Sequence, residues 1–231
     1  MKLYELAGAD PQRLFSPHCW KARFALAHKG LKAETVPWRY ADKKAIAFTG
    51  QDRVPVLTHG ERHVHDSWRI AEYLEQNYPQ RPSLFGGSAG HALARFVNAW
   101  VDTAMNPGII SLIVTDLHKI LAKKDKSYFR KSREERFGMK LEKLTADRDE
   151  RVAGFRASLS PLRVTLDAQP YLGGDLPLYA DYCAFASFVW ARNSSTFELL
   201  EAGDPLNDWC ERLYDAFDGL ARSVPAMTDA A

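Results

Sequence analysis

The chain has 231 residues, of which 46% are hydrophobic and 12% aromatic, a composition typical of a globular protein with a substantial core. The formal net charge is only +2, which gives no indication of nucleic acid as a partner. The N-terminus carries no apolar leader, and the longest uncharged run, residues 103–115, is too short to span a bilayer. We therefore expect a protein that binds neither nucleic acid nor a membrane.

The three cysteines of the chain are Cys19, Cys183 and Cys210, and they show no paired spacing. Such usage fits a reducing compartment better than a disulfide framework. The sequence therefore predicts a cytoplasmic protein.

The first part of the chain alternates short strand-like and helix-like segments. A βαβ unit followed by a ββα unit is expected, which predicts a small mixed α/β sheet covered by helices. The hairpin of the second unit is expected to turn at His59 and Gly60. The predicted elements are strands at 2–6 and 32–38, a helix over 16–29, the hairpin over 54–65 and a helix over 66–78.

The first predicted helix opens with Ser16 and Pro17, which suit a helix start without any chemistry nearby. Serine at the N-cap accepts a hydrogen bond from a free backbone N–H, and proline at the first helical position sacrifices none. The residues leave open whether this is only a cap or a site that handles a thiol. We expect the apolar face to hold Trp20, Phe24 and Ala27, and the polar side to hold Lys21, Arg23, His28 and Lys29.

Pro55 begins an otherwise apolar strand, where it cannot donate to a ladder. From the residues alone we expect an edge strand with a trans Val54–Pro55 bond. The alternative is a cis bond that turns the backbone of Val54 outward, as an edge with which a peptide ligand can pair.

Asp66 and Ser67 precede the next helix and are predicted to cap it. A helix N-terminus also binds anions, and an aspartate beside it can bind an ammonium group. A ligand that carries both an amine and a carboxylate would suit this position.

Two polar stretches have alternative interpretations. His63 and His65 beside Asp66 invite a metal site, but we expect a polar strand face and no metal. Residues 119–136 hold eight lysines or arginines against three acids, which predicts a solvated helix face or loop. Attraction of anionic substrates is the alternative for this stretch.

After a stretch rich in proline, glycine and serine, only helical periodicity follows. We expect one helix with a kink at Pro107, one interrupted at Pro161, one from about Tyr179 to Asn193, and a last one that opens at Asp204 and Pro205. The predicted organisation is an α/β domain over 1–81, a linker over 82–90 and an all-α domain over 91–231.

Four features at these separations resemble a cytosolic glutathione transferase: the helix start "SPHCW", the strand "VPVL", "DS" before the next helix, and "YLGGDLPLYADYCAF" in the helical part. The resemblance covers nearly the whole chain. It implies a thioredoxin-like N-terminal domain, an all-α C-terminal bundle, a homodimer and glutathione as cofactor.

The resemblance also implies roles for individual residues. Ser16 matches the catalytic position of the serine-type members. The backbone of Val54, beside a cis proline, would pair with the cysteine of glutathione, and Asp66 and Ser67 would hold its γ-glutamyl end. The glutathione-binding residues implied in this way are Arg53, Val54, Pro55, Asp66 and Ser67.

More narrowly, "SPHCWKARFALAHKG", "FGMKLE" and "YADY" resemble the etherase-like branch, which includes bacterial β-aryl etherases and related fungal members. This implies attack of the glutathione thiol on small hydrophobic aromatic electrophiles, with β-aryl ether cleavage as one form. Tyr179, Tyr182 and Trp190 are candidates for the substrate wall, although core packing is the role we expect for them. Rival functions are a non-catalytic carrier of hydrophobic ligands, and thiol-disulfide or deglutathionylation chemistry through Cys19.

The sequence departs from the family pattern at Leu178, where many members carry serine or threonine as the partner of Asp181 in a capping pair. Asp181 alone can still accept from a backbone N–H. We therefore expect a weaker cap on this helix.

Overall fold

The structure, a computed structural model, describes residues 1–228. Its N-terminal part is built on a sheet of four strands in the order β2-β1-β3-β4, with β1 and β2 parallel and the other pairs antiparallel. The expected thioredoxin-like βαβ-ββα arrangement is thereby confirmed. Its elements are β1 (Lys2–Leu6), α1 (Pro17–His28), β2 (Glu34–Trp38), a short helix η1 (Lys43–Thr49), β3 (Val56–His59), β4 (Arg62–His65) and α2 (Ser67–Asn77).

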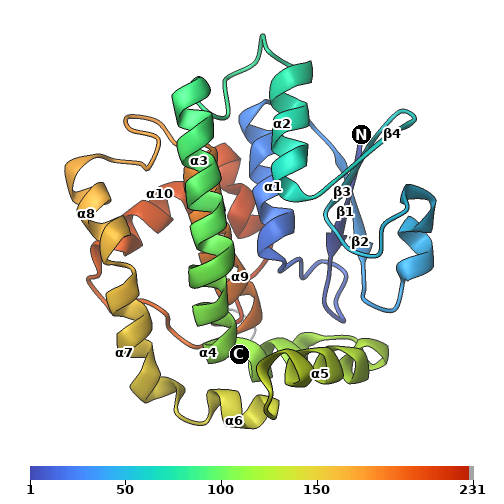
Figure 1. The fold of residues 1–231 in the computed structure, drawn as a ribbon, viewed down its shortest axis with the longest axis vertical. Helices are drawn as coiled ribbons and strands as arrows, with labels where there is room; N and C mark the ends of the chain where they lie inside the picture. Colours follow the sequence, from blue (N-terminus) through green and yellow to red (C-terminus); the bar gives the residue numbers. More distant parts are fainter. Residues whose placement is uncertain (229–231) are drawn as a thin grey trace.

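The C-terminal part is entirely helical, as expected. The irregularity predicted at Pro107 is a π-helical turn immediately before it, within one long rod formed by α3 and α4 (Figure 1). The break predicted at Pro161 separates α7 from α8. The elements are α3 (Ser88–Trp100), the π turn η2 (Val101–Met105), α4 (Asn106–Ile120), α5 (Lys123–Phe137), α6 (Leu141–Thr145), α7 (Arg148–Ser158), α8 (Ser160–Ala168), α9 (Tyr179–Ser194), α10 (Pro205–Gly219) and η3 (Leu220–Ser223).

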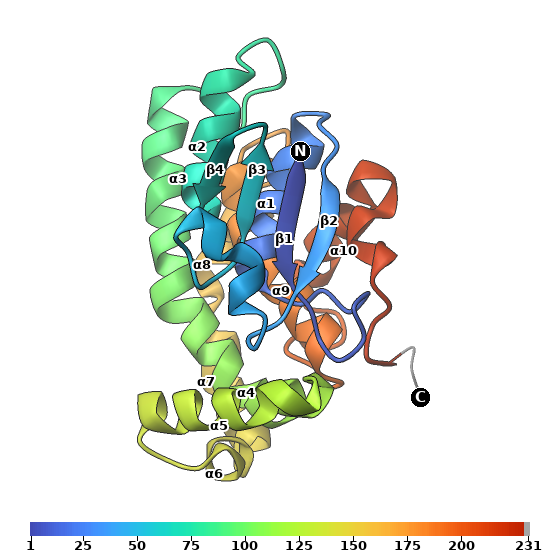
Figure 2. The same ribbon diagram turned by 90° about the vertical axis from the view of Figure 1, so that its right-hand side faces the viewer.

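The two parts pack as layers around α1. Figure 1 shows α1 and α2 on one side of the sheet, with the α3–α4 rod and α9 beyond them. Helix α5 crosses the lower end of both the sheet and the rod, as Figure 2 shows from the side. The N-terminus of α1 therefore opens toward the region where sheet, rod and α5 meet. The connection between α2 and α3 contains the start of the predicted linker, whose far end overlaps α3.

Two lysines of α1 contradict the predicted polar side, because Lys21 and Lys29 are both fully buried. Lys21 Nζ donates to Oδ1 of Asn98 at 3.0 Å and of Asp102 at 2.7 Å. Lys29 pairs with Glu75 of α2. The prediction was wrong because α3 and the π turn cover Lys21 while α2 covers Lys29, and a buried ammonium group needs a carboxylate partner.

Asp181 in the first turn of α9 is the anchor of the loop before that helix. Its buried carboxylate accepts hydrogen bonds from the backbone N–H groups of Leu172 at 2.7 Å, Gly173 at 2.9 Å and Leu178 at 3.0 Å. It also accepts from the indole N–H of Trp209 at 3.0 Å, which ties α9 to α10. Leu178 contributes no side-chain cap, so only the aspartate half of the family's capping pair is present, as the sequence indicates.

In the part of the chain that the structure describes, no helix combines the length and the apolar character needed to cross a bilayer. All three cysteines are free and buried.

We predict that Asp181→Ala lowers the free energy of unfolding by about 3 kcal/mol or more, because it leaves several buried N–H donors without an acceptor. Asp175→Ala, an exposed position in the same loop, should change it by less than about 0.5 kcal/mol. Urea unfolding followed by tryptophan fluorescence measures both values. Equal stabilities of the two variants would contradict the anchoring role.

Candidate active site

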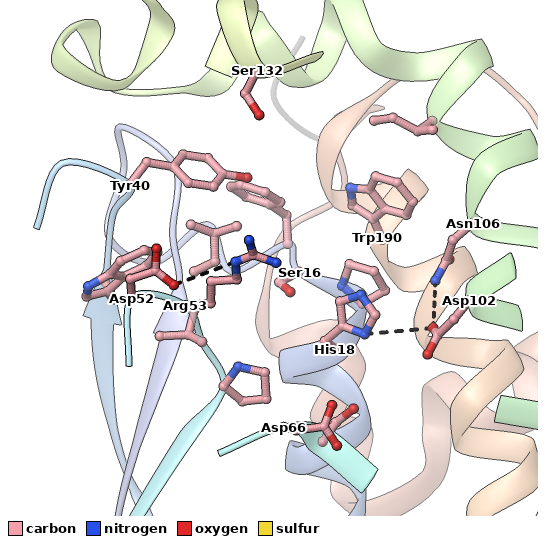
Figure 3. Close-up of a pocket in the computed structure, with 18 of the residues that line it drawn as sticks. Ser16, His18, Tyr40, Asp52, Arg53, Asp66, Asp102, Asn106, Ser132 and Trp190 are labelled. Atoms are coloured by element: carbon pink, nitrogen blue, oxygen red, sulfur yellow. Dashed lines mark hydrogen bonds and ion pairs between the residues drawn. The ribbon is translucent and has the colours of Figure 1, made fainter. Parts of the chain in front are cut away.

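The described residues form a cleft of about 640 Å³ between the two parts of the fold. Figure 3 shows Ser16 near its centre, Tyr40 and Arg53 on one side, Trp190 and Asp102 on the other, and Ser132 of α5 facing them. Four separate segments of the N-terminal part and four helical elements supply its walls. Every predicted site residue lines it: Ser16, Arg53, Val54, Pro55, Asp66 and Ser67.

Ser16 is the N-cap of α1, where its Oγ accepts from the backbone N–H of Cys19 at 3.4 Å. A hydroxyl has one donor hydrogen besides its acceptor lone pairs, so this bond leaves the O–H free to donate into the cleft. The position also adds the partial positive charge of the helix N-terminus to the same spot. Ser16 can therefore cap the helix and donate to an anion at once.

The Val54–Pro55 peptide bond is cis. The trans bond expected from the residues alone was wrong, and the cis bond implied by the resemblance is confirmed. The ladder between β1 and β3 ends at Val56, so Val54 lies beyond the last paired residue of the strand. Its backbone borders the cleft instead of the sheet.

Asp66 has a backbone φ of 70°, in the left-handed region that aspartate tolerates better than most residues. One of its carboxylate oxygens accepts from the N–H groups of Trp68 at 3.0 Å and Arg69 at 3.1 Å, so it caps α2 as predicted. Ser67 is buried beside it, and its carbonyl accepts from the hydroxyl of Tyr179 at 2.9 Å. The second oxygen of Asp66 takes no part in the cap.

Arg53 lies on the rim, with 90% of its side chain exposed and its guanidinium 3.6 Å from Asp52. Lys43 of η1 pairs with the same carboxylate at 3.2 Å. These two cations share one acid at the outer edge of the N-terminal wall.

The opposite wall contains a polar cluster that sequence reasoning missed. Asp102 of the π turn accepts from Lys21 and from Asn106, the latter at 3.2 Å, and lies 3.8 Å from Nδ1 of His18. Partial desolvation of the imidazole by the surrounding protein, followed by the Lys21 cation, lowers the pKa of His18. No sequence spacing links His18 to Asp102, because they meet only when the two parts pack together.

The remaining wall is aromatic and apolar. Trp190 of α9 lies there with Ile110 and Leu117, and it is also buried in the core, the role expected for it. Tyr40 adds a phenol whose pKa burial raises to about 12, so it stays protonated at neutral pH. The other two candidates are core residues: Tyr179 is buried against Ser67, and Tyr182 contacts His28.

Cys19 does not line the cleft, although it follows Ser16 by one helical turn. Its side chain is buried, and burial raises the pKa of the thiol to about 12. A thiol in this state is a poor nucleophile, because the thiolate is the reactive form.

Among residues 1–228, no group of three or more potential metal ligands comes together. His63 packs edge-on against Phe48, with ring centroids 5.0 Å apart.

Two family models match the chain. Residues 12–82 match the glutathione S-transferase N-terminal domain, and residues 92–219 match the glutathione S-transferase C-terminal domain.

Curated relatives include the glutathione S-transferase-like protein ustS of Aspergillus flavus, 29% identical over 54% of this chain and 49% of its own length. The probable glutathione S-transferase GSTU6 of Oryza sativa is 30% identical over 47% of this chain and 51% of its own. The chain thus spans about half the length of the curated relatives it matches.

The fold is similar to solved structures across nearly its full length. Glutathione transferase GSTFuA3 of Phanerochaete chrysosporium superposes with a TM-score of 0.82 at 24% identity, over 94% of this chain and 95% of the other. A glutathione S-transferase of Ceriporiopsis subvermispora in complex with glutathione gives a TM-score of 0.78 at 23% identity, over 94% and 97%.

Proposed function

The chain belongs to the glutathione S-transferase family, and from that premise we propose that it activates the thiol of glutathione for attack on small hydrophobic aromatic electrophiles. Glutathione is the co-substrate of the family. One observation carries the proposal: Ser16, Val54–Pro55 and Asp66–Ser67 come from three separate segments and line one cleft beside an apolar wall.

The proposed position of glutathione follows from the chemistry of each wall. The ammonium group of the γ-glutamyl residue binds the free oxygen of Asp66. The α-carboxylate of that γ-glutamyl residue binds at the N-terminus of α2. Its cysteine pairs with the backbone of Val54, which lies outside the strand ladder. Arg53 on the rim is the candidate partner for the glycyl carboxylate.

This position brings the thiol to Ser16 and the N-terminus of α1. A free thiol has a pKa of about 8.5, and a hydroxyl donor together with a helix N-terminus lowers it. Each unit of lowering corresponds to about 1.4 kcal/mol in favour of the thiolate. The thiolate then attacks an electrophilic carbon: the carbon–sulfur bond forms, and the leaving group departs with the electron pair of its bond.

Cleavage of β-aryl ethers is the narrower form of the proposal, in which an aryloxide leaves. It rests on the sequence resemblance to the etherase-like branch, as does the serine-type assignment. A carrier without turnover would need the apolar wall but not a serine hydroxyl at the thiol position. Chemistry through Cys19 has little support, because the thiol is buried and its pKa is raised to about 12.

We predict that glutathione raises the free energy of unfolding of the protein by about 2.7 kcal/mol at a hundredfold excess over Kd, since it binds only the folded form.

Asp66→Asn keeps the cap acceptor but removes the charge, and should weaken the binding of glutathione about tenfold. Asp208→Asn, exposed on α10 and outside the cleft, is the matched control. Calorimetric titration measures the Kd of glutathione for the wild type and for both variants. Equal affinities of the two variants would contradict the assignment of Asp66.

We predict that Ser16→Ala lowers kcat about a hundredfold and changes glutathione affinity little, since the hydroxyl acts mainly on the developing thiolate. The pKa of the bound thiol should rise, so the pH dependence of the rate shifts to higher pH. The ultraviolet absorbance of the thiolate, recorded against pH, measures this pKa. Loss of the cap costs about 1 kcal/mol, so a folded variant remains to be assayed. Cys19→Ala should keep most of the activity; the reverse pattern would make the cysteine the nucleophile.

We also propose a homodimer, with the exposed face of α3 as part of its interface. Leu93 and Phe96 are 68% and 71% exposed and lie one turn apart, so they form a continuous apolar strip on one helix. Family members are typically dimeric, and a second copy of this chain is the occupant that covers this strip.

Sedimentation should therefore give about twice the chain mass of 26.1 kDa at micromolar concentration. Phe96→Glu should shift the species to the monomer, because it places a charge where the dimer would bury an aromatic side chain. Val164→Glu, at a residue of α8 that is 73% exposed, should leave the mass unchanged. A wild-type species of 26.1 kDa would contradict the proposal.

A further inference from the structure

The charged side chains that line the cleft differ in whether the protein already neutralises them. Lys43 and Arg53 share Asp52 on the N-terminal rim. Asp102 is paired with Lys21 on the opposite wall. Each of these side chains therefore has an ion-pair partner before any ligand enters.

Arg133 and Arg136 are different. Both belong to α5 and line the cleft, and among the described residues neither forms an ion pair with a carboxylate. Arg133 donates to the hydroxyl of Ser132 at 3.1 Å and lies over the ring of Phe129 at 4.8 Å. Arg136 lies 5.6 Å from the ring of Phe137. Two guanidinium groups therefore face the cleft without a counter-charge, on a helix whose neighbour Arg130 is held by two glutamates.

These arginines lie on the electrophile side of the cleft. Helix α5 lies at the end of the cleft opposite the strand segments that carry the proposed glutathione contacts (Figure 3). Ser132 directly precedes Arg133 in sequence and points toward the space between Tyr40 and Trp190. A group bound by α5 is thus presented beside the aromatic wall.

The same region can hold a ring. Tyr40 and Tyr128 lie with ring centroids 5.7 Å apart, and both line the cleft. Trp190, Ile110 and Leu117 add apolar surface across from them. A planar aromatic body can pack here with one edge toward the arginines, and a guanidinium group donates two parallel hydrogen bonds to a carboxylate in its plane.

We infer that the electrophile accepted by this cleft is an aromatic compound with an acidic substituent, whose anion Arg133 and Arg136 hold while the ring rests against Tyr40, Tyr128 and Trp190. The inference rests on the proposed function and narrows its substrate class. The basic stretch that includes α5 then serves to attract an anionic substrate, the alternative to a merely solvated helix face. Glutathione itself does not need these arginines.

A matched pair of electrophiles tests the inference: 4-chloro-3-nitrobenzoate and the neutral 4-chloro-3-nitrobenzamide. In both, the thiolate forms a carbon–sulfur bond to the ring, chloride leaves with the electron pair of the carbon–chlorine bond, and the thiol proton passes to the solvent. Each kcat/KM is divided by the uncatalysed rate constant of the same compound with glutathione, which removes the difference in intrinsic reactivity.

We expect the normalised kcat/KM of the benzoate to exceed that of the benzamide by about tenfold, the effect of about one charge-assisted hydrogen bond. Arg133→Gln and Arg136→Gln should each reduce this preference, and the double variant should abolish it while the benzamide stays within about twofold. The preference should also fall with added salt, because Arg136 is exposed. Lys131→Gln removes the same charge from α5 at a side chain that is 80% exposed and outside the cleft, and should retain the preference.

The affinities of the reaction products provide a second test, which does not depend on catalytic turnover. The S-conjugates of glutathione with the carboxylated and the carbamoylated ring are titrated into the wild type and the double variant. Equal affinities of the two conjugates for the wild type would overturn the inference, as would a loss of affinity for free glutathione in the double variant. Failure of free glutathione to bind the wild type would instead overturn the proposed function.

Discussion

The ion pair between the buried Lys21 and the partly exposed Asp102 joins the two parts of the protein and is the contact on which the site depends. Lys21 belongs to α1 and is fully buried, while Asp102 belongs to the π turn of the long rod. An ammonium group in the interior without a carboxylate partner is strongly destabilising. The helical part must therefore pack on α1 so that Asp102 reaches Lys21, which places the rod, His18 and the start of α1 on the same cleft.

That arrangement lets one helix end do two things. The N-terminus of α1 needs an acceptor for its free N–H groups, and Ser16 supplies it. Because the helix start lies at the cleft instead of in the core, the same hydroxyl keeps a donor for a ligand. The start of α2 repeats the pattern with Asp66, whose carboxylate caps the helix through one oxygen. Helix starts that are ordinary in isolation become a proposed binding site by facing the same space.

The cleft is electrostatically divided. On the N-terminal side the charges are paired or used in caps, whereas α5 contributes Arg133 and Arg136 without acids. The division is the physical basis for separating a glutathione side from a side that selects an acidic electrophile.

What the sequence determined by itself is mostly local. Ser16, Asp66 and Asp204 mark helix starts, Pro107 and Pro161 mark irregularities, and Gly60 lies at a hairpin turn, because capping and backbone restriction act over a few residues. The residues of the proposed glutathione side could be predicted from the sequence, because they too belong to the short motifs that carry the family resemblance.

Only the tertiary structure decided which side chains are buried and which face the cleft. Lys21 and Lys29 are charged residues on a helix, and only the packing of α3, the π turn and α2 removes them from water. Tyr179 and Trp190 lie on the same helix, yet one is core and the other lines the cleft. Arg133 and Arg136 lie in a basic stretch typical of a solvated face, and only the crossing of α5 over the cleft turns them toward it. The burial and the orientation of these side chains depend on contacts between residues far apart in the chain, which no local pattern encodes.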